Sequence, residues 1–223
     1  YEMWSMDKIK PDTNALEKFK KKYKGPYVIS AKLDGVSALY STESEIPSLY
    51  TRGDGKYGQL INHLIPYLNL PTQKNITLRG ELIIKENTFK TEYEKQFSNS
   101  RNFISGLVNR KKISYKEEEM LKDIDFVGYE VIIPENLTPS QQYNKLIELE
   151  TNSVKNIQSI NYETLTNEFL SNNLIDFRSN YEYTIDGIIC IDDKIYSRES
   201  KNPDHAFAFK MVLTEQEIEA KVL

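Results

Sequence analysis

Apolar residues recur along the chain at the two spacings that distinguish helices from strands. In residues 58–68 they fall three or four positions apart, which places them on one face of a helix. Those positions are Leu60, Ile61, Leu64, Ile65 and Leu68. Similar spacing, helped in places by a flanking proline or glycine, predicts further helices. They cover residues 12–24, 87–96, 102–109, 140–150 and 162–172.

Continuous or alternating apolar runs predict the strands of the chain. They cover residues 27–32, 36–40, 77–84, 125–133, 186–192 and 206–212. The first two runs flank Asp34-Gly35, and Asp-Gly is a favoured hairpin turn, so a strand pair joined there is expected. Helices and strands follow one another in mixed order without an internal repeat, which predicts an α+β or α/β fold.

Composition describes an ordinary globular chain. Its 223 residues suffice for one large domain, and 39% of them are hydrophobic and 28% charged. The net charge of −4 argues against a protein that coats DNA generally, although a local basic patch can still steer a phosphate backbone. Two such patches span residues 18–24 and 101–112, and the first is more simply explained as the solvated face of a helix.

Cysteine usage and hydropathy exclude several classes of protein. Cys190 is the single cysteine, so a disulfide framework and a cysteine-rich zinc site are excluded within this chain. No apolar run approaches the ~18 residues of a membrane span, and no signal peptide is visible, so no membrane partner is expected.

The candidate chemistry begins at Lys32-Leu33-Asp34-Gly35. Lys32 ends an apolar run, which places it at the end of a buried strand. A nucleophilic lysine must react as the neutral amine, and apolar walls and neighbouring cations both favour that form. The alternative for these four residues alone is a solvated lysine before a turn.

Further motifs follow in a fixed order and carry a resemblance. They are Thr51-Arg52-Gly53-Asp54-Gly55, Leu78-Arg79-Gly80-Glu81-Leu82, Asn99-Ser100-Arg101-Asn102, Ile185-Asp186-Gly187-Ile188-Ile189 and Ala206-Phe207-Ala208-Phe209-Lys210. From Trp4 to Lys210 the chain resembles the adenylation domain of NAD-dependent DNA ligases. The resemblance implies an α+β nucleotidyltransferase fold of antiparallel sheets with flanking helices. It also implies a lysyl-AMP intermediate made from NAD, transfer of AMP to the 5′-phosphate of nicked double-stranded DNA, Mg²⁺ as the divalent cation, and a monomer.

The same resemblance assigns roles around the reacting phosphate. Lys32 is the expected nucleophile, while Arg52 and Lys210 hold the α-phosphate as cations. Glu81 accepts from the ribose hydroxyls. Two further catalytic candidates, Asp34 and Asp186, orient the lysine, act as base or approach a metal. Since each precedes a glycine, a plain turn is the alternative.

Other residues match the positions that contact the base and the DNA. Tyr129 matches an aromatic that stacks on adenine, and the alternative is a core tyrosine. Ser5 and Met6 match a segment that touches the adenine. Arg101 and Arg110 fall in the phosphate- or nick-binding region.

Three departures from the family pattern stand out. Ser30 replaces a glutamate that accepts from the adenine amine, and its shorter side chain predicts weaker base discrimination. Ile191 replaces a lysine. Asn109, with Arg110 next to it, replaces an arginine, and the loss of a cation beside a phosphate can cost ~1.5–3 kcal/mol.

The resemblance also predicts the organisation of the chain. Residues 1–213 form the expected adenylation domain, and residues 214–223 the tail that leads to an OB-fold. A separate N-terminal helical domain grips the nicotinamide mononucleotide half in this family, and the chain has no room for it. Two alternatives remain open: an ATP-dependent DNA or RNA ligase core, and a degenerate ligase-like module that binds nucleic acid. The abundance of Lys, Ile, Asn and Tyr fits an AT-rich genome, so the expected location is a bacterial cytoplasm or a viral replication site in the host cytoplasm.

Overall fold

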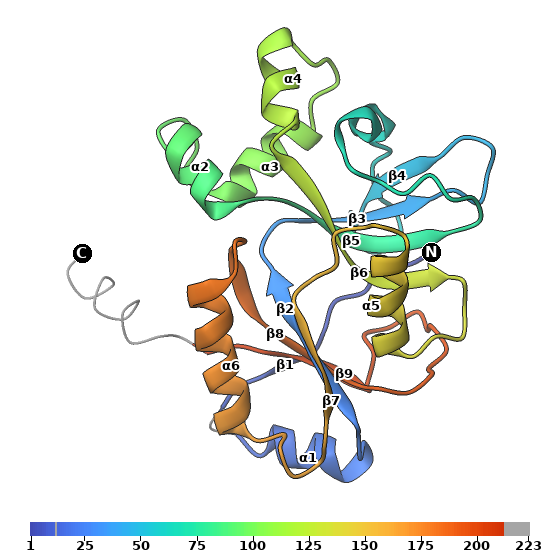
Figure 1. Cartoon of the computed structure of the whole chain (residues 1–223), viewed down its shortest axis with the longest axis vertical. Helices are drawn as coiled ribbons and strands as arrows, with labels where there is room; N and C mark the ends of the chain where they lie inside the picture. Colours follow the sequence, from blue (N-terminus) through green and yellow to red (C-terminus); the bar gives the residue numbers. More distant parts are fainter. Residues whose placement is uncertain (12, 212–223) are drawn as a thin grey trace.

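A computed structural model describes residues 1–11 and 13–211. The chain folds into two β-sheets with helices around them (Figure 1). The five-stranded sheet has the order β1-β9-β8-β2-β7, and the four-stranded sheet has the order β4-β3-β5-β6. Apart from the parallel pair β1 and β9, all neighbouring strands run antiparallel. The predicted α+β class with antiparallel sheets is therefore confirmed.

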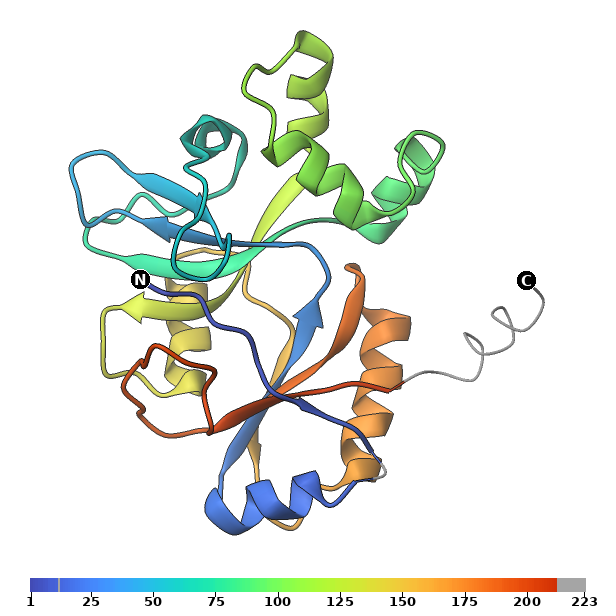
Figure 2. The same ribbon diagram turned by 180° about the vertical axis from the view of Figure 1, so that it is seen from behind.

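The strands and helices are placed as follows. The strands are β1 (Lys8–Ile9), β2 (Tyr27–Leu33), β3 (Val36–Ser41), β4 (Ser48–Thr51), β5 (Thr77–Ile84), β6 (Ile124–Ile133), β7 (Asn156–Ile160), β8 (Ile185–Asp192) and β9 (Ala206–Phe209). The helices are α1 (Ala15–Lys22), η1 (Asn62–Tyr67), α2 (Glu86–Glu92), α3 (Ser100–Val108), α4 (Tyr115–Leu121), α5 (Pro139–Glu148) and α6 (Asn167–Asn180). Figure 2 shows α2, α3 and α4 gathered at one end of the molecule and α1 at the other.

The strand pair predicted at Asp34-Gly35 is wrong. β2 pairs with β7 and β8, whereas β3 pairs with β4 and β5 in the other sheet. The amide of Asp34 donates to the carbonyl of Thr184 rather than to β3. Each strand finds two partners elsewhere, so pairing over the whole fold overrides the local turn preference of Asp-Gly. The dipeptide instead carries the chain from one sheet to the other.

Two predicted helices differ in extent or type. Residues 58–68 contain a short 3₁₀ helix, Asn62–Tyr67, because Pro66 lacks the amide hydrogen that a continuing α-helix needs. Ile61 and Leu64 are buried, but Leu60 is exposed. The helix predicted over residues 162–172 begins later, since the Thr166 side chain accepts from the amide of Phe169 and caps α6 there.

Several elements had no counterpart in the hydrophobic pattern. β1 and β4 are very short, and β7 is an edge strand with polar and exposed positions. α4 begins at the capping residue Ser114, whose hydroxyl accepts from the amide of Glu117. The first residue of the predicted helix 12–24, the last residue of the predicted strand 206–212 and the predicted tail 214–223 lie outside the described residues.

No helix in the described part of the chain combines the length and apolar character that crossing a membrane requires.

Candidate functional site

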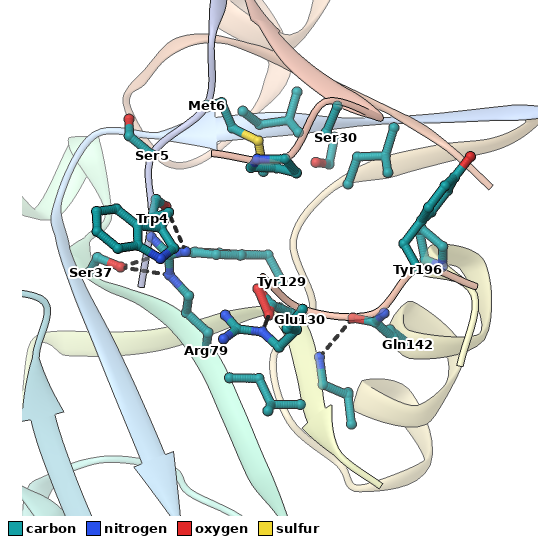
Figure 3. Close-up of a pocket in the computed structure, with 18 of the residues that line it drawn as sticks. Trp4, Ser5, Met6, Ser30, Ser37, Arg79, Tyr129, Glu130, Gln142 and Tyr196 are labelled. Atoms are coloured by element: carbon teal, nitrogen blue, oxygen red, sulfur yellow. Dashed lines mark hydrogen bonds and ion pairs between the residues drawn. The ribbon is translucent and has the colours of Figure 1, made fainter. Parts of the chain in front are cut away.

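A cleft of about 1280 Å³ is lined by residues of both sheets. The N-terminal segment, strands β2, β3, β5 and β6, and the loop before β9 contribute its walls (Figure 3). Eight predicted site residues line it: Ser5, Met6, Ser30, Lys32, Arg52, Glu81, Arg101 and Tyr129. The fold therefore brings together residues that are far apart in the sequence.

The lysine end of the cleft is organised by one carboxylate. Lys32 Nζ lies 3.1 Å from Asp186 Oδ1 and 3.3 Å from Oδ2. Lys210 Nζ lies 3.1 Å from Asp186 Oδ2. All three side chains are about one-quarter to one-third exposed, so solvent reaches the group. Two amines and one carboxylate are thus held together at the ends of β2, β8 and β9.

Asp34 faces a different cation. Arg101, on α3, donates from its guanidinium to Asp34 Oδ1. α3 is held at its start by Asn99, whose side chain accepts from the amide of Asn102. The two motifs that contain Asp34 and Arg101 meet here, although the residues are 67 positions apart.

Glu81 lies on the four-stranded sheet and is buried at the side of the cleft, with an exposed fraction of 8%. Its Oε1 accepts from the amide of Gly35 at 3.3 Å, and its Oε2 accepts from the Tyr129 hydroxyl at 3.4 Å. Burial raises the pKa of the Glu81 carboxyl to about 7, and the positive charges of Arg79 and Lys32 oppose that rise. The group therefore titrates near neutral pH.

Tyr129 is held by Ser37 and by Arg79, two residues to which the sequence motifs assigned no role. Its hydroxyl lies 2.9 Å from Ser37 Oγ, and the guanidinium carbon of Arg79 lies 5.5 Å from the centre of its ring. Arg79 Nε also donates to Ser37 Oγ at 3.2 Å. Burial raises the pKa of the Tyr129 phenol to about 12. A buried arginine in the middle of an apolar strand was the available sequence signal.

The N-terminal segment is fastened to the cleft by two arginines. Arg52 Nε donates to the carbonyl of Met3 at 2.8 Å, and an Arg79 Nη donates to the carbonyl of Trp4 at 3.0 Å. These bonds hold Ser5 and Met6 beside the cavity in Figure 3. Gly53 supports the Arg52 loop, because its φ is +56° and a side chain there would meet the carbonyl oxygen of Tyr57 at 1.9 Å.

Arg110 lies apart from the residues above. It follows α3, is not among the residues lining the cleft, and its Nε lies 3.4 Å from Glu117 Oε2. The prediction that it contacts DNA remains a prediction.

The two acidic residues predicted to act in catalysis are already paired with cations, so they do not form a separate set of ligands for the Mg²⁺ that the resemblance implies. Asp186 already faces two amines and Asp34 faces Arg101. Over residues 1–11 and 13–211, no three histidine, cysteine, aspartate or glutamate side chains cluster as metal ligands. The protein groups alone do not fit a metal centre, and the Mg²⁺ prediction stays untested.

Comparison with solved structures defines the class of fold. A structure from a study of Lig E DNA ligases aligns with a TM-score of 0.60 at 14% identity, covering 95% of this chain and 69% of that one. An archaeal ATP-dependent RNA ligase aligns with a TM-score of 0.61 at 10% identity, covering 98% of this chain and 50% of that one. The chain has the nucleotidyltransferase fold of polynucleotide ligases.

Sequence comparison identifies the family within that class. The model of the NAD-dependent DNA ligase adenylation domain matches residues 1–213, so the chain belongs to this family. A DNA ligase of Acanthamoeba polyphaga mimivirus is 39% identical over 215 residues, which are 93% of this chain and 33% of the relative. Putative DNA ligase 205R of Invertebrate iridescent virus 6 is 39% identical over 219 residues, 94% of this chain and 35% of the relative. The chain spans about a third of the length of these relatives.

Proposed function

We propose that this chain adenylates itself at Lys32 with NAD as the donor, and that the AMP then passes to the 5′-phosphate of nicked double-stranded DNA. The proposal is carried by Lys32, which lines the cleft, and by the Asp186 carboxylate that contacts both Lys32 and Lys210, in a chain of this family. Lys32 supplies the amine that reacts, the Asp186 carboxylate adjoins it, and the Lys210 amine contacts the same carboxylate.

In the first step, the electron pair of the neutral Lys32 amine forms a bond to the α-phosphorus. The bond from that phosphorus to the bridging oxygen breaks, and nicotinamide mononucleotide leaves with the electron pair. The amine must also lose a proton, which Asp186 can accept at 3.1 Å. Arg52 and Lys210 bind the negative phosphate oxygens as charge develops on them.

The remaining cleft residues hold the nucleoside. Glu81 accepts from the ribose hydroxyls, and Tyr129 supplies an aromatic face for the adenine. Ser5 and Met6 close the cavity from the N-terminal side. These roles use the two sheets together, because Lys32 lies on one and Glu81 on the other.

In the second step, an oxygen of the DNA 5′-phosphate attacks the adenylate phosphorus, and the bond to Lys32 breaks. Arg101 and Arg110 bind the DNA backbone. We expect residues 1–213 to act as one monomeric adenylation domain, in a bacterial cytoplasm or at a viral replication site in the host cytoplasm.

The test is to incubate the purified chain with NAD and with ATP separately and to weigh it by mass spectrometry. An increase equal to one AMP with NAD, absent in Lys32→Ala, supports the proposal. An adduct formed with ATP but not with NAD would identify ATP as the donor instead. Absence of an adduct from either donor, with AMP still bound in calorimetry, would overturn the covalent step.

A further inference from the structure

The N-terminal segment runs from one sheet to the other beside the cleft. Arginines on the four-stranded sheet and on the loop after β4 hold the carbonyls of Met3 and Trp4. A few residues later, β1 pairs with β9 in the five-stranded sheet. Ser5 and Met6 lie between these two attachments and line the cleft. The position of this segment at the cavity therefore depends on how the two sheets are held relative to each other.

Arg198, in the loop between β8 and β9, makes a further connection between the sheets. Its Nε lies 2.7 Å from Glu130 Oε1, and its Nη1 donates to the carbonyl of Glu2 at 2.8 Å. Glu130 lies on β6 in the four-stranded sheet, whereas β8 and β9 belong to the five-stranded sheet. Figure 2 shows the β8–β9 loop beside β6, and Figure 3 shows Glu130 across the cavity from Met6. One guanidinium thus joins the loop, the N-terminal segment and the opposite wall of the cleft.

This connection is suited to fixing geometry rather than to stabilising the fold. The side chains of Arg198 and Glu130 are 34% and 25% exposed, and ion pairs that solvent reaches contribute little to stability. A guanidinium is planar, however, and its donors point in fixed directions, so two acceptors bound to it are fixed relative to each other. Both side chains also line the cleft. On the other side of the bond, Glu2 Oε2 accepts from Trp4 Nε1 at 2.9 Å, which orders the segment that Arg198 holds.

We propose that Arg198 is a positioning residue for the nucleotide, which keeps the N-terminal segment and the two walls of the cleft at the separation that binding requires. This inference rests on the proposed function, because it takes the cleft as the nucleotide site. A site that is ordered before the ligand arrives loses less conformational freedom on binding, so its affinity is higher. The bonds of Arg198 go to Glu130 and Glu2 rather than to the lysine end of the cleft. Nucleotide affinity should therefore depend on Arg198, and the maximal rate of the covalent step should not.

The experiment combines calorimetric titration with AMP and the rate of adduct formation at saturating NAD, followed by intact mass. Arg198→Gln should weaken AMP binding about tenfold and leave the maximal rate within about twofold of wild type. Glu130→Gln loses one of the two bonds and should weaken AMP binding about threefold. Arg198→Lys keeps the charge but lacks the planar fork, so its affinity should fall between those of wild type and Arg198→Gln.

A double variant separates positioning from direct contact. Arg198→Gln combined with Glu130→Gln should bind AMP no more weakly than Arg198→Gln alone, because the ion pair is already broken. A further loss in the double variant would show that Glu130 itself contacts the nucleotide and would overturn the inference. Thermal unfolding shows whether each variant is folded, and Glu130→Gln decides the inference if Arg198→Gln is not.

Lys201→Gln is the matched control for charge on the same loop. Lys201 pairs with Glu199 and Asp204 of the loop itself, so its loss should leave AMP affinity unchanged. An equal loss in Lys201→Gln and Arg198→Gln would show a general attraction of cations for phosphate and would overturn the inference. Equal AMP affinity in wild type and Arg198→Gln, or a slower maximal rate with unchanged affinity, would also overturn it and leave the proposed function standing. Wild type that binds AMP but forms no adduct would overturn the covalent step alone, and wild type that binds no AMP would overturn both.

Discussion

Lys32 and Asp186 face each other from neighbouring strands, with Nζ and Oδ1 3.1 Å apart, although 154 residues separate them in the sequence. The register of β2 and β8 fixes this meeting, because Lys32 lies opposite Gly187, the residue after Asp186. The pair connects the nucleophile to a group that can take its proton. Substitution of either residue tests whether the reaction requires the pair.

Replacing the nucleophile is the first test. Lys32→Ala should abolish the AMP adduct while leaving the melting temperature nearly unchanged, because the amine end of this side chain is partly solvated and contributes little to the core. Intact-mass measurement after incubation with NAD gives the answer. An adduct that persisted in the variant would place the nucleophile elsewhere.

Asp186→Asn should slow adduct formation by about 10²–10⁴-fold, the usual contribution of a positioned proton acceptor. The amide keeps the size of the side chain but neither accepts a proton nor balances Lys32 and Lys210. The rate of mass increase under single-turnover conditions measures the effect. Asp176→Asn, on α6, is the matched control, and equal rates for the two variants would remove Asp186 from the mechanism.

The raised pKa of the Glu81 carboxyl predicts how the stability of the fold changes with pH. Its folded-state pKa of about 7 lies above the ordinary value of 4.5, so the folded chain holds the proton more tightly than the unfolded chain. The stabilisation is complete below pH 4.5 and is lost as pH rises through 7, by about 3 kcal/mol. Glu81→Gln should remove this decline in the free energy of unfolding. Urea unfolding across that pH range measures it, with Glu148→Gln as the exposed control. A decline that is the same in Glu81→Gln and wild type would show that another group causes it.

Tyr129 provides a test of base stacking. Tyr129→Ala should weaken AMP binding by ~1–3 kcal/mol, roughly ten- to a hundredfold. Tyr129→Phe keeps the ring face and should leave affinity close to wild type. It should cost about 1 kcal/mol of stability, because the hydroxyl bonds to Ser37 and Glu81 are lost. Calorimetry with AMP and thermal unfolding separate the two effects, and unchanged affinity in Tyr129→Ala would make the residue a core tyrosine.

Arg101 should matter for DNA more than for folding. The ion pair between Arg101 and Asp34 is partly exposed to solvent, so Arg101→Ala should cost less than about 1 kcal/mol of stability. If Arg101 neutralises one backbone phosphate, the salt dependence of nicked-DNA binding should decrease by about 0.9 in slope. Arg110→Ala tests the second predicted contact in the same assay. Lys18→Ala, on α1 at the opposite end of the molecule in Figure 1, should leave the slope unchanged. An unchanged slope for Arg101→Ala would exclude that contact.

The sequence predicted what depends on local chemistry. β5 was located to the residue, since its apolar run is continuous and buried throughout. The strand-end position of Lys32 followed from the apolar run before it. Strand partners were not predictable in this way, because pairing joins distant residues and the Asp-Gly turn favoured the wrong neighbour. β7 was missed since an edge strand needs few apolar positions.

The same distinction holds within the cleft. The motifs identified residues with reactive or charged ends, such as Lys32 and Glu81. They gave no role to Arg79 or Ser37, whose importance comes from what they touch. Ser37 resembles an ordinary strand serine until the fold places its hydroxyl 2.9 Å from that of Tyr129.

The passage of the chain between sheets at Asp34-Gly35 has a mechanical consequence. Lys32 and Asp186 belong to one sheet and Glu81 and Tyr129 to the other, so a nucleotide that contacts both groups fastens the two sheets together. Pulling the sheets apart must then rupture ligand contacts as well as protein contacts. An optical-tweezers measurement should detect occupancy as added resistance to force, and a covalently attached nucleotide should keep that resistance after free nucleotide is washed away.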